Sequence, residues 1–398
     1  MLIGLVGKPS CGKSTFFKAA TLAEVAIASY PFTTIKPNRG VGYVKVDCID
    51  KEFKTQCNPT HGFCINHNRF VPVELIDVAG LVPGASEGKG LGNQFLDDLR
   101  QADVFIHIVD SSGTTDAEGK QVDNYDPCND IIFLEEELNK WFYSILSKVW
   151  KSFARRVEQE ASKNSNLNFS EAVAKQFSGL KVTEEHVKKA MSKINFKDKP
   201  SEWDEKQIME FASYLRKLSK PMIIAANKSD LENSQDNIRR MQERFSEYKI
   251  YPCSADSELA LREAAKTKLI EYIPGEGNFK IIGELNEKQK IALEKIKRCV
   301  LDVYGNTGIQ NILNTAVFDF LKYVAVFPAS ANKLSDSKGN ILPDCFLLPP
   351  NSTALDFAFF LHTDLGKNFV KAVDVRTKRV LGKNYILKNR DALEIITN

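Results

Sequence analysis

The chain has 398 residues, of which 43% are hydrophobic and 26% are charged, and its formal net charge is +3. This length predicts two or three domains, and so small a net charge does not by itself indicate a nucleic-acid-binding protein. No apolar stretch approaches the ~20 residues that a membrane span requires. The first expected strand begins at Leu2, which leaves no room for a signal peptide. We therefore expect a cytoplasmic protein without membrane contact, whose cysteines are reduced.

The N-terminal segment reads as a strand, a tight loop and a helix. An apolar run at Leu2–Val6 is followed by GKPSCGKS at Gly7–Ser14 and by the helix-compatible run Thr15–Ala20. The loop matches G-x-x-x-x-G-K-[ST], in which backbone N–H groups surround phosphates, a lysine neutralises the β- and γ-phosphates and a hydroxyl binds magnesium. An ordinary glycine-rich turn is the alternative, and the motifs below argue against it. The residues expected to bind the nucleotide here are Gly7, Lys8, Pro9, Ser10, Cys11, Gly12, Lys13, Ser14 and Thr15, with Ser14 as a metal ligand.

A second phosphate-sensing motif follows two expected strands. The segment Tyr30–Asn38 carries two prolines and two threonines and is expected to be an extended loop. Strands are expected at Val41–Cys48 and Phe70–Ile76, and the latter runs into Asp77-Val78-Ala79-Gly80. In this D-x-x-G motif the aspartate can hold magnesium through water, and the glycine amide can bond a γ-phosphate. A simple turn is the alternative.

The hairpin between those strands contains Cys57, His61, Cys64 and His67. These four side chains could form a tetrahedral structural zinc site. Their spacing fits none of the well-known zinc-finger patterns, and a polar hairpin tip with buried thiols is the alternative. Such a zinc ion would stabilise a loop and take no part in chemistry.

Two further buried strands are expected at Asp103–Asp110 and Pro221–Ala226, about 110 residues apart along the chain. The interval between them has helical periodicity and predicts an inserted helical domain. Its expected helices are Phe133–Arg156, Glu171–Phe177, Glu184–Ile194 and Glu205–Leu218. His107 lies within the first of the two strands and is interpreted as a core histidine.

A base-reading motif, Asn227-Lys228-Ser229-Asp230, directly follows the second of these strands. The Asp230 carboxylate can accept hydrogen bonds from the ring N–H and the exocyclic amine of guanine, and adenine offers no such pair of donors. An Asp230 that merely caps a helix is the alternative. Ser254 and Ala255 follow the next strand, Tyr248–Tyr251, where a backbone N–H could contact the guanine oxygen.

The rest of the chain divides at Pro274–Gly277. Before it, a helix is expected at Ser257–Tyr272, and after it helices are expected at Asn286–Tyr304 and Ile309–Leu321. From Lys322 the pattern changes to that of a small α+β module. Its expected strands are Tyr323–Phe327, Cys345–Leu348, Phe369–Val373 and Leu393–Ile396, with one helix at Ala354–Leu361.

The ordered motifs resemble those of the translation-factor-related GTPases of the Obg superfamily. The run DVAGLVPGASEGKGLGNQFL from Asp77 to Leu96 is similar to the second switch of the YchF/Obg-like ATPase subfamily. The run LDFAFFLHTDLG from Leu355 to Gly366 resembles the TGS domain that ends many such proteins, and the helical insertion resembles an archaeal YchF-type form.

This resemblance implies an α/β fold: a P-loop NTPase G domain with a mostly parallel sheet, a helical insertion and a C-terminal, ubiquitin-like α+β TGS domain. The expected boundaries are 1–120 and 219–275 for the G domain, 121–218 for the insertion, 276–321 for a helical connector and 322–398 for the TGS domain. It also implies that Thr34, rather than Thr33, binds magnesium with Ser14 and Asp77. Lys13, Thr34 and Gly80 are the expected catalytic residues, and Asn227, Lys228 and Asp230 are expected to select the base.

Three features depart from the patterns of related GTPases. The subfamily usually has a base motif ending in glutamate and favours ATP, whereas this chain retains Asp230 and is therefore expected to bind GTP and Mg²⁺. The family commonly has asparagine at the position of Ser10, associated with potassium-stimulated hydrolysis, which puts potassium dependence in doubt here. Leu81 has no polar atom to orient a water molecule, so slow intrinsic hydrolysis is expected.

A molecular switch that hydrolyses GTP slowly, associated with the ribosome or RNA through the TGS domain, is the predicted function. The alternatives are an Obg-like ATPase and an RNA- or ribosome-binding adaptor whose nucleotide is largely structural. A basic stretch in the tail favours contact with RNA phosphates, although a solvated surface explains it equally well. It consists of Lys367, Lys371, Arg376, Lys378, Arg379, Lys383, Lys388 and Arg390.

Overall fold

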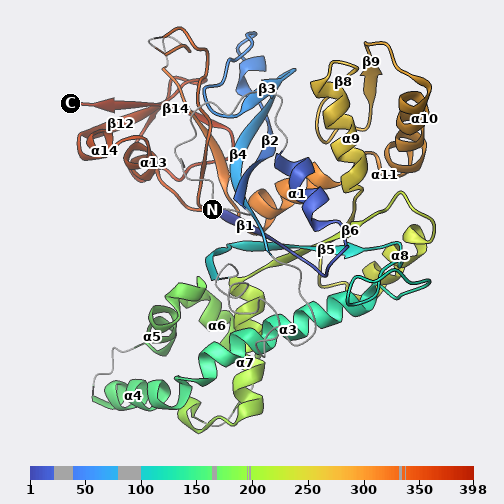
Figure 1. The fold of residues 1–398 in the computed structure, drawn as a ribbon. Helices are drawn as coiled ribbons and strands as arrows, with labels where there is room; N and C mark the ends of the chain where they lie inside the picture. Colours follow the sequence, from blue (N-terminus) through green and yellow to red (C-terminus); the bar gives the residue numbers. More distant parts are fainter. Residues whose placement is uncertain are drawn as a thin grey trace. The chain divides into compact units, whose positions relative to one another are not determined.

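The computed structural model describes residues 1–21, 39–78, 100–163, 168–194, 196, 199–330, 334–336 and 338–398. They form two compact units (Figure 1). The first unit consists of Met1–Phe17 and Leu75–Asp256, and the second consists of Lys18–Glu74 and Ser257–Asn398. No helix in these ranges is both long enough and apolar enough to cross a bilayer.

The first unit is built on a parallel sheet, as the sequence predicts. Hydrophobic residues occupy nearly every position of its central strands, which are buried along their length because helices cover parallel sheets. The register pairs Val6 with His107, and Asp110 with Asn227. The strands follow the order β1 (Leu2–Val6), β5 (Val104–Asp110), β6 (Met222–Asn227) and β7 (Ile250–Pro252), with the end of β4 (Asn68–Asp77) beside β1.

The interval between β5 and β6 is helical, so the predicted helical insertion is confirmed. Thr183 and Asp204 begin two of its helices with capping boxes, which satisfy backbone N–H groups at the helix ends. The elements are α3 (Cys128–Ser147), α4 (Trp150–Lys163), α5 (Phe169–Gln176), η3 (Ser178–Leu180), α6 (Glu184–Lys193), η4 (Pro200–Glu202) and α7 (Glu205–Ser219). The chain continues with α8 (Ser234–Arg244) after β6.

Aromatic packing and one buried cation stabilise the insertion. The rings of Trp150 and Trp203 stack with centroids 5.3 Å apart, and both side chains are buried. Helices α3 and α7 lie side by side (Figure 1), and the buried Arg216 of α7 donates to Asn139 at 2.9 Å and to Glu135 at 3.2 Å in α3. The apolar faces of these helices therefore pack together and against residues of the sheet.

The second unit contains a β-hairpin formed by β3 and the first residues of β4. Strand β3 (Phe63–Ile65) pairs antiparallel with β4, while β2 (Arg39–Asp47) lies on the other side of β4, and η1 (Ile49–Lys51) follows β2. The rings of Phe63 and Phe70 stack at 4.5 Å and Tyr43 packs against Phe63 at 5.0 Å. This small apolar cluster holds the hairpin to the strands.

The predicted helix Ser257–Tyr272 is correct only in its first part. Helix α9 (Ala255–Lys266) ends before a strand, β8 (Ile270–Tyr272), which pairs antiparallel with β9 (Phe279–Ile281). Ile270 and Tyr272 point to the core while Glu271 is exposed, which is the alternation of a half-buried strand. The predicted helices that follow are confirmed as helical segments: α10 (Glu287–Ile296), η5 (Lys297–Leu301), α11 (Asp302–Tyr304), α12 (Ile309–Asn314) and η6 (Thr315–Phe320).

The C-terminal part of the second unit is an α+β module, as predicted. Its strands follow the order β11-β10-β14-β12-β13, in which β10 and β14 are parallel and the other pairs are antiparallel. Thr353 caps the helix that covers this sheet, and Phe357 is buried in its core. The elements are β10 (Val324–Pro328), β11 (Phe346–Leu348), α13 (Ala354–Leu361), α14 (Thr363–Lys367), β12 (Phe369–Asp374), β13 (Val380–Leu381) and β14 (Asp391–Thr397).

Candidate nucleotide-binding site

The phosphate-loop motif lies between the end of β1 and α1 (Lys13–Thr21), as its sequence predicts. Its backbone enters the left-handed region at Ser10 and Gly12, with φ values of 61° and 91°. Lys13 and Ser14, in the first turn of α1, converge on Asp77 at the end of β4. The Lys13 ammonium lies 3.5 Å from Asp77 Oδ1, and Ser14 Oγ donates to Asp77 Oδ2 at 3.1 Å.

This convergence fits a magnesium–phosphate group. A hydroxyl and a carboxylate oxygen are hard ligands of the kind that magnesium prefers, and a lysine beside them can bind phosphate oxygens. The N-terminal end of α1 adds N–H groups that have no partner within the helix. Two segments distant in sequence are thus brought to one edge of the sheet.

Lys8 does not direct its side chain to the phosphate-binding edge, although its backbone belongs to the loop. Its ammonium is buried, donates to Thr115 O at 2.6 Å and forms an ion pair with Asp130 at 2.8 Å. It also lies 4.2 Å from the centroid of the Tyr125 ring. Burial raises the pKa of Asp130 to about 6, even though Lys8 opposes the shift. The Lys8 side chain therefore joins the loop to the start of the helical insertion.

Asn227 connects the phosphate loop to the base motif. Its Nδ2 donates to Cys11 O at 2.9 Å, and its Oδ1 accepts from the backbone N–H of Ala255 at 3.0 Å. A Cβ atom at Gly12 would lie 2.2 Å from Asn227 Nδ2, so only glycine fits this close approach. Asn227 thereby connects the three segments that the sequence predicts to bind the nucleotide.

Lys228 is held by an aspartate that sequence reasoning did not assign to the site. The Lys228 ammonium lies 2.7 Å from the buried Asp110 Oδ2, at the end of β5. Asp110 also accepts hydrogen bonds from Ser112 Oγ at 2.5 Å and Thr115 Oγ1 at 2.7 Å. Burial raises the Asp110 pKa, but bonds from Lys228 and these hydroxyls outweigh it and lower the pKa overall. The sequence signal that could have identified Asp110 is its position as a charged residue at the end of the buried strand β5, which pairs with the strand leading into the base motif.

Asp230 and Ser254 form a direct pair. Ser254 Oγ donates to Asp230 Oδ1 at 2.7 Å. The next residue, Ala255, donates its backbone N–H to Asn227 Oδ1. One oxygen of the carboxylate is thus held, and the side chain is partly exposed. The predicted base-reading residues Asn227, Asp230, Ser254 and Ala255 therefore share one local network in the structure.

The buried thiol and imidazole groups near the loop remain uncharged at neutral pH. Burial raises the pKa of Cys11 to about 11, and burial together with Lys8 lowers the pKa of His107 to about 3. Burial also raises the pKa of Cys253 far above its usual range. His107 is a neutral core residue, as the sequence analysis expected.

Four residues of the two predicted switch segments fall within 22–38 and 79–99. Thr33 and Thr34 of the threonine loop, and Gly80 and Leu81 of the second switch, lie outside the described residues. Their roles therefore remain sequence-based predictions.

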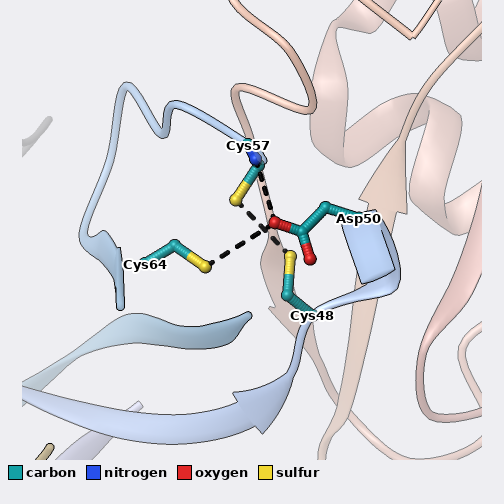
Figure 2. A group of neighbouring side chains, drawn as sticks. All are labelled: Cys48, Asp50, Cys57 and Cys64. Carbon is teal, nitrogen blue, oxygen red and sulfur yellow. Dashed lines mark hydrogen bonds between the residues drawn. The ribbon is translucent and has the colours of Figure 1, made fainter. Parts of the chain in front are cut away.

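The cysteine-rich hairpin differs from its prediction. The expected zinc ligands were Cys57, His61, Cys64 and His67, but the structure groups Cys57 and Cys64 with Cys48 and Asp50 (Figure 2). The two histidines face carboxylates instead: His61 Nδ1 lies 3.0 Å from Asp344 Oδ1, and His67 Nδ1 lies 2.9 Å from Asp50 Oδ1. The predicted ligand set was wrong because the chain turns into η1 directly after β2, which places Cys48 and Asp50 beside Cys57 and Cys64. The corrected group could hold a metal ion.

The basic tail is partly occupied by contacts within the second unit. Arg376 and Arg390 both form ion pairs with Glu52, and Arg390 Nε donates to Asp47 O at 2.9 Å. Hydrogen bonds from Arg376, together with the charge of Arg390, lower the pKa of Glu52. These two arginines therefore contribute less to an RNA-binding surface than the sequence suggested.

Comparison with known proteins links these features to known families. The 50S ribosome-binding GTPase family matches residues 2–140, the domain described as "Obg-like GTPase YGR210-like, G4 motif-containing domain" matches residues 225–330, and the TGS domain matches residues 338–397. The uncharacterized GTP-binding protein MJ1332 of Methanocaldococcus jannaschii is 47% identical over 399 residues, covering 100% of this chain and 99% of its own.

Two further relatives extend over the whole chain. The crystal structure of a GTP binding protein from Pyrococcus horikoshii OT3 has a TM-score of 0.77 and 40% identity, with 100% of both chains covered. The ribosome-binding ATPase YchF of Bacillus subtilis is 26% identical, covering 99% of this chain and 98% of its own. These matches cover the nucleotide site and the C-terminal module together, so the relatives share the whole length of this chain.

Proposed function

Because the chain belongs to the Obg-like GTPases of the YchF/MJ1332 type, with a YGR210-like G4 domain and a C-terminal TGS domain, we propose that it binds GTP with Mg²⁺ and hydrolyses it slowly as a molecular switch. That it is an Obg-family P-loop nucleotide-binding protein follows from the family itself. The choice of GTP over ATP, and hydrolysis as a switch, are the proposal.

In this proposal each residue of the site has one role. Lys13 binds the β- and γ-phosphates, Ser14 and Thr34 ligate magnesium and Asp77 holds its water shell, while Gly80 contacts the γ-phosphate. Magnesium, when bound, neutralises charge on the phosphates. The proposed domains are a G domain at 1–120 and 219–275, an insertion at 121–218, a connector at 276–321 and a TGS domain at 322–398.

The arrangement of Asp230 carries the preference for GTP. Ser254 Oγ holds Asp230 Oδ1 at 2.7 Å, and Asn227 joins the same network to Cys11 of the phosphate loop at 2.9 Å. A carboxylate held in this way matches the paired N–H donors on one edge of guanine, and adenine has no equivalent pair. The names of the relatives leave this choice open, because MJ1332 is described as GTP-binding and YchF as an ATPase.

An exchange of base specificity tests the proposal. Asp230→Asn would present an amide N–H where guanine offers its exocyclic amine, so GTP binding weakens, while xanthine, which has an oxygen there, gains a partner. We expect GTP affinity to fall, XTP affinity to rise and ATP to remain a weak ligand in calorimetric titrations. A wild-type chain that binds ATP as tightly as GTP would contradict the proposal and favour an ATPase.

Association with the ribosome or RNA is a second part of the proposal. It is supported by the TGS-domain match at residues 338–397 and by the match to ribosome-binding GTPases at residues 2–140. Phosphate contacts should weaken as salt increases. Co-sedimentation with ribosomes at two salt concentrations, with GDP or a non-hydrolysable GTP analogue, tests it. Binding that does not depend on the nucleotide would favour an adaptor rather than a switch.

A further inference from the structure

We propose that Cys48, Asp50, Cys57 and Cys64 bind one structural Zn²⁺ ion (Figure 2). The site lies in the second unit and goes beyond the proposed nucleotide-binding function. Among the residues that the structure describes, it is the only group of this kind. It consists of three thiols and a carboxylate, which is a ligand set that zinc accepts.

The ligands come from four consecutive parts of the chain around one hairpin. Cys48 directly follows β2, Asp50 lies in η1, Cys57 lies in the loop after η1 and Cys64 lies in β3. The backbone N–H of Cys48 donates to His67 O at 2.8 Å, which fixes the base of the loop against the turn that follows β3. A short stretch of chain therefore brings all four ligands together.

The distances suit a tetrahedral ion. Potential ligand atoms of the four residues all lie within 4.8 Å of one another. The Sγ atoms of Cys48 and Cys57 are 3.5 Å apart, and Cys64 Sγ lies 3.9 Å from Asp50 Oδ2. Zn–S bonds of about 2.3 Å in tetrahedral geometry separate two sulfurs by about 3.8 Å, so an ion fits with little movement. Figure 2 shows the three sulfurs and the carboxylate facing one another.

Two neighbouring side chains complete the surroundings of the ligands. His67 Nδ1 lies 2.9 Å from Asp50 Oδ1, an arrangement in which a second residue orients a metal-binding carboxylate. The fully buried Arg69 places Nη1 3.4 Å from Cys57 Sγ. Three thiolates and a carboxylate around a divalent ion leave an excess of negative charge, which the Arg69 guanidinium partly balances. A buried arginine beside a neutral thiol would have no such partner.

The site would stabilise the loop that contacts the C-terminal module. Asn58 N donates to Ile341 O at 3.1 Å, Thr60 N donates to Pro343 O at 2.8 Å, and Arg69 Nη2 donates to Leu342 O at 3.0 Å. Between Cys57 and Cys64 the loop has no regular secondary structure before β3 begins at Phe63. An ion binding both ends of this segment would hold the Asn58 and Thr60 donors in position.

Metal content and cobalt spectroscopy test the proposal on the full chain. The chain, purified with a phosphine reductant and dialysed against metal-free buffer, should retain one zinc ion, and Co²⁺ added to the metal-free chain should give thiolate-to-cobalt charge-transfer absorption. A Cys57→Ser/Cys64→Ser variant should lose both signals. Cys299→Ser, which removes a cysteine outside the group, should keep them. His67→Ala should weaken zinc binding by about 10- to 100-fold.

The wild-type chain alone can overturn the proposal, even if the double variant does not fold. A reduced chain that takes up Co²⁺ without a thiolate band, or that retains no zinc after dialysis, would contradict it. So would a folded double variant that retains its zinc. A chelator should also increase proteolytic cleavage at 52–62, and unchanged cleavage after proven zinc removal would refute the structural role.

Discussion

The contact between Gly12 and Asn227 provides the sharpest test of how the phosphate loop is held. In Gly12→Ala the new Cβ atom would lie 2.2 Å from Asn227 Nδ2, at a backbone φ of 91° that side chains rarely adopt. Asn227 would have to move, and its bonds to Cys11 O and from Ala255 N would be lost or lengthened. The phosphate loop and the base motif would then no longer be held in a fixed position relative to each other.

The size of the effect follows from these contacts. A residue held in a sparsely populated backbone region costs about 1–3 kcal/mol, and each of the two hydrogen bonds contributes about 1 kcal/mol. The total of about 3–5 kcal/mol corresponds to a loss of nucleotide affinity of roughly 10²- to 10⁴-fold. Because both phosphate and base contacts depend on Asn227, affinity for GDP and GTP should fall together.

Fluorescent-nucleotide titration measures this loss, and Gly305→Ala is the matched control. Gly305 also has a positive φ, 76°, but a Cβ atom there meets nothing within 4 Å. Gly305→Ala therefore introduces the same kind of backbone strain without a steric clash, and Gly305 lies outside the nucleotide site. A folded Gly12→Ala chain that binds both nucleotides as tightly as the wild type would refute the role assigned to Asn227.

Three other perturbations address the first unit. Lys8→Met leaves Asp130 buried without its cation and should lower the free energy of unfolding by about 3 kcal/mol, while adding Asp130→Asn should recover part of it; additive losses in urea titrations would contradict the pairing. Burial lowers the pKa of Lys220 to about 7 in the folded chain. Because Lys220 stays protonated to higher pH in the unfolded chain, the free energy of unfolding should rise from pH 7 to about 10. Lys220→Met should flatten this rise when thermal unfolding is measured across that pH range. Trp203→Ala removes the ring stacked on Trp150 and should cost about 3–5 kcal/mol, with nucleotide affinity retained; a smaller cost in chemical unfolding would mean that the insertion packs without it.

The helices and strands were largely predictable because their signals are local. The apolar run that forms β5, the capping residue Asp204 and the periodicity of α7 all act within a few residues of the chain. The strand β8 was missed because Ile270-Glu271-Tyr272 is too short for its alternation to be distinguished from the end of a helix. Its pairing with β9 decided the outcome.

The positions of the motifs were also predictable, since the motifs directly follow the apolar runs that form β1, β4 and β6. The sequence by itself therefore determined the order of the phosphate, switch and base motifs and the α/β architecture that carries them. Only the tertiary structure decided which residues hold those motifs: Asp110 binds Lys228, and Ser254 binds Asp230, across long separations in sequence. It also replaced two histidines with Cys48 and Asp50 in the hairpin group. Such choices depend on where a turn such as η1 directs the chain, and no local pattern of residues encodes which distant side chain will lie opposite.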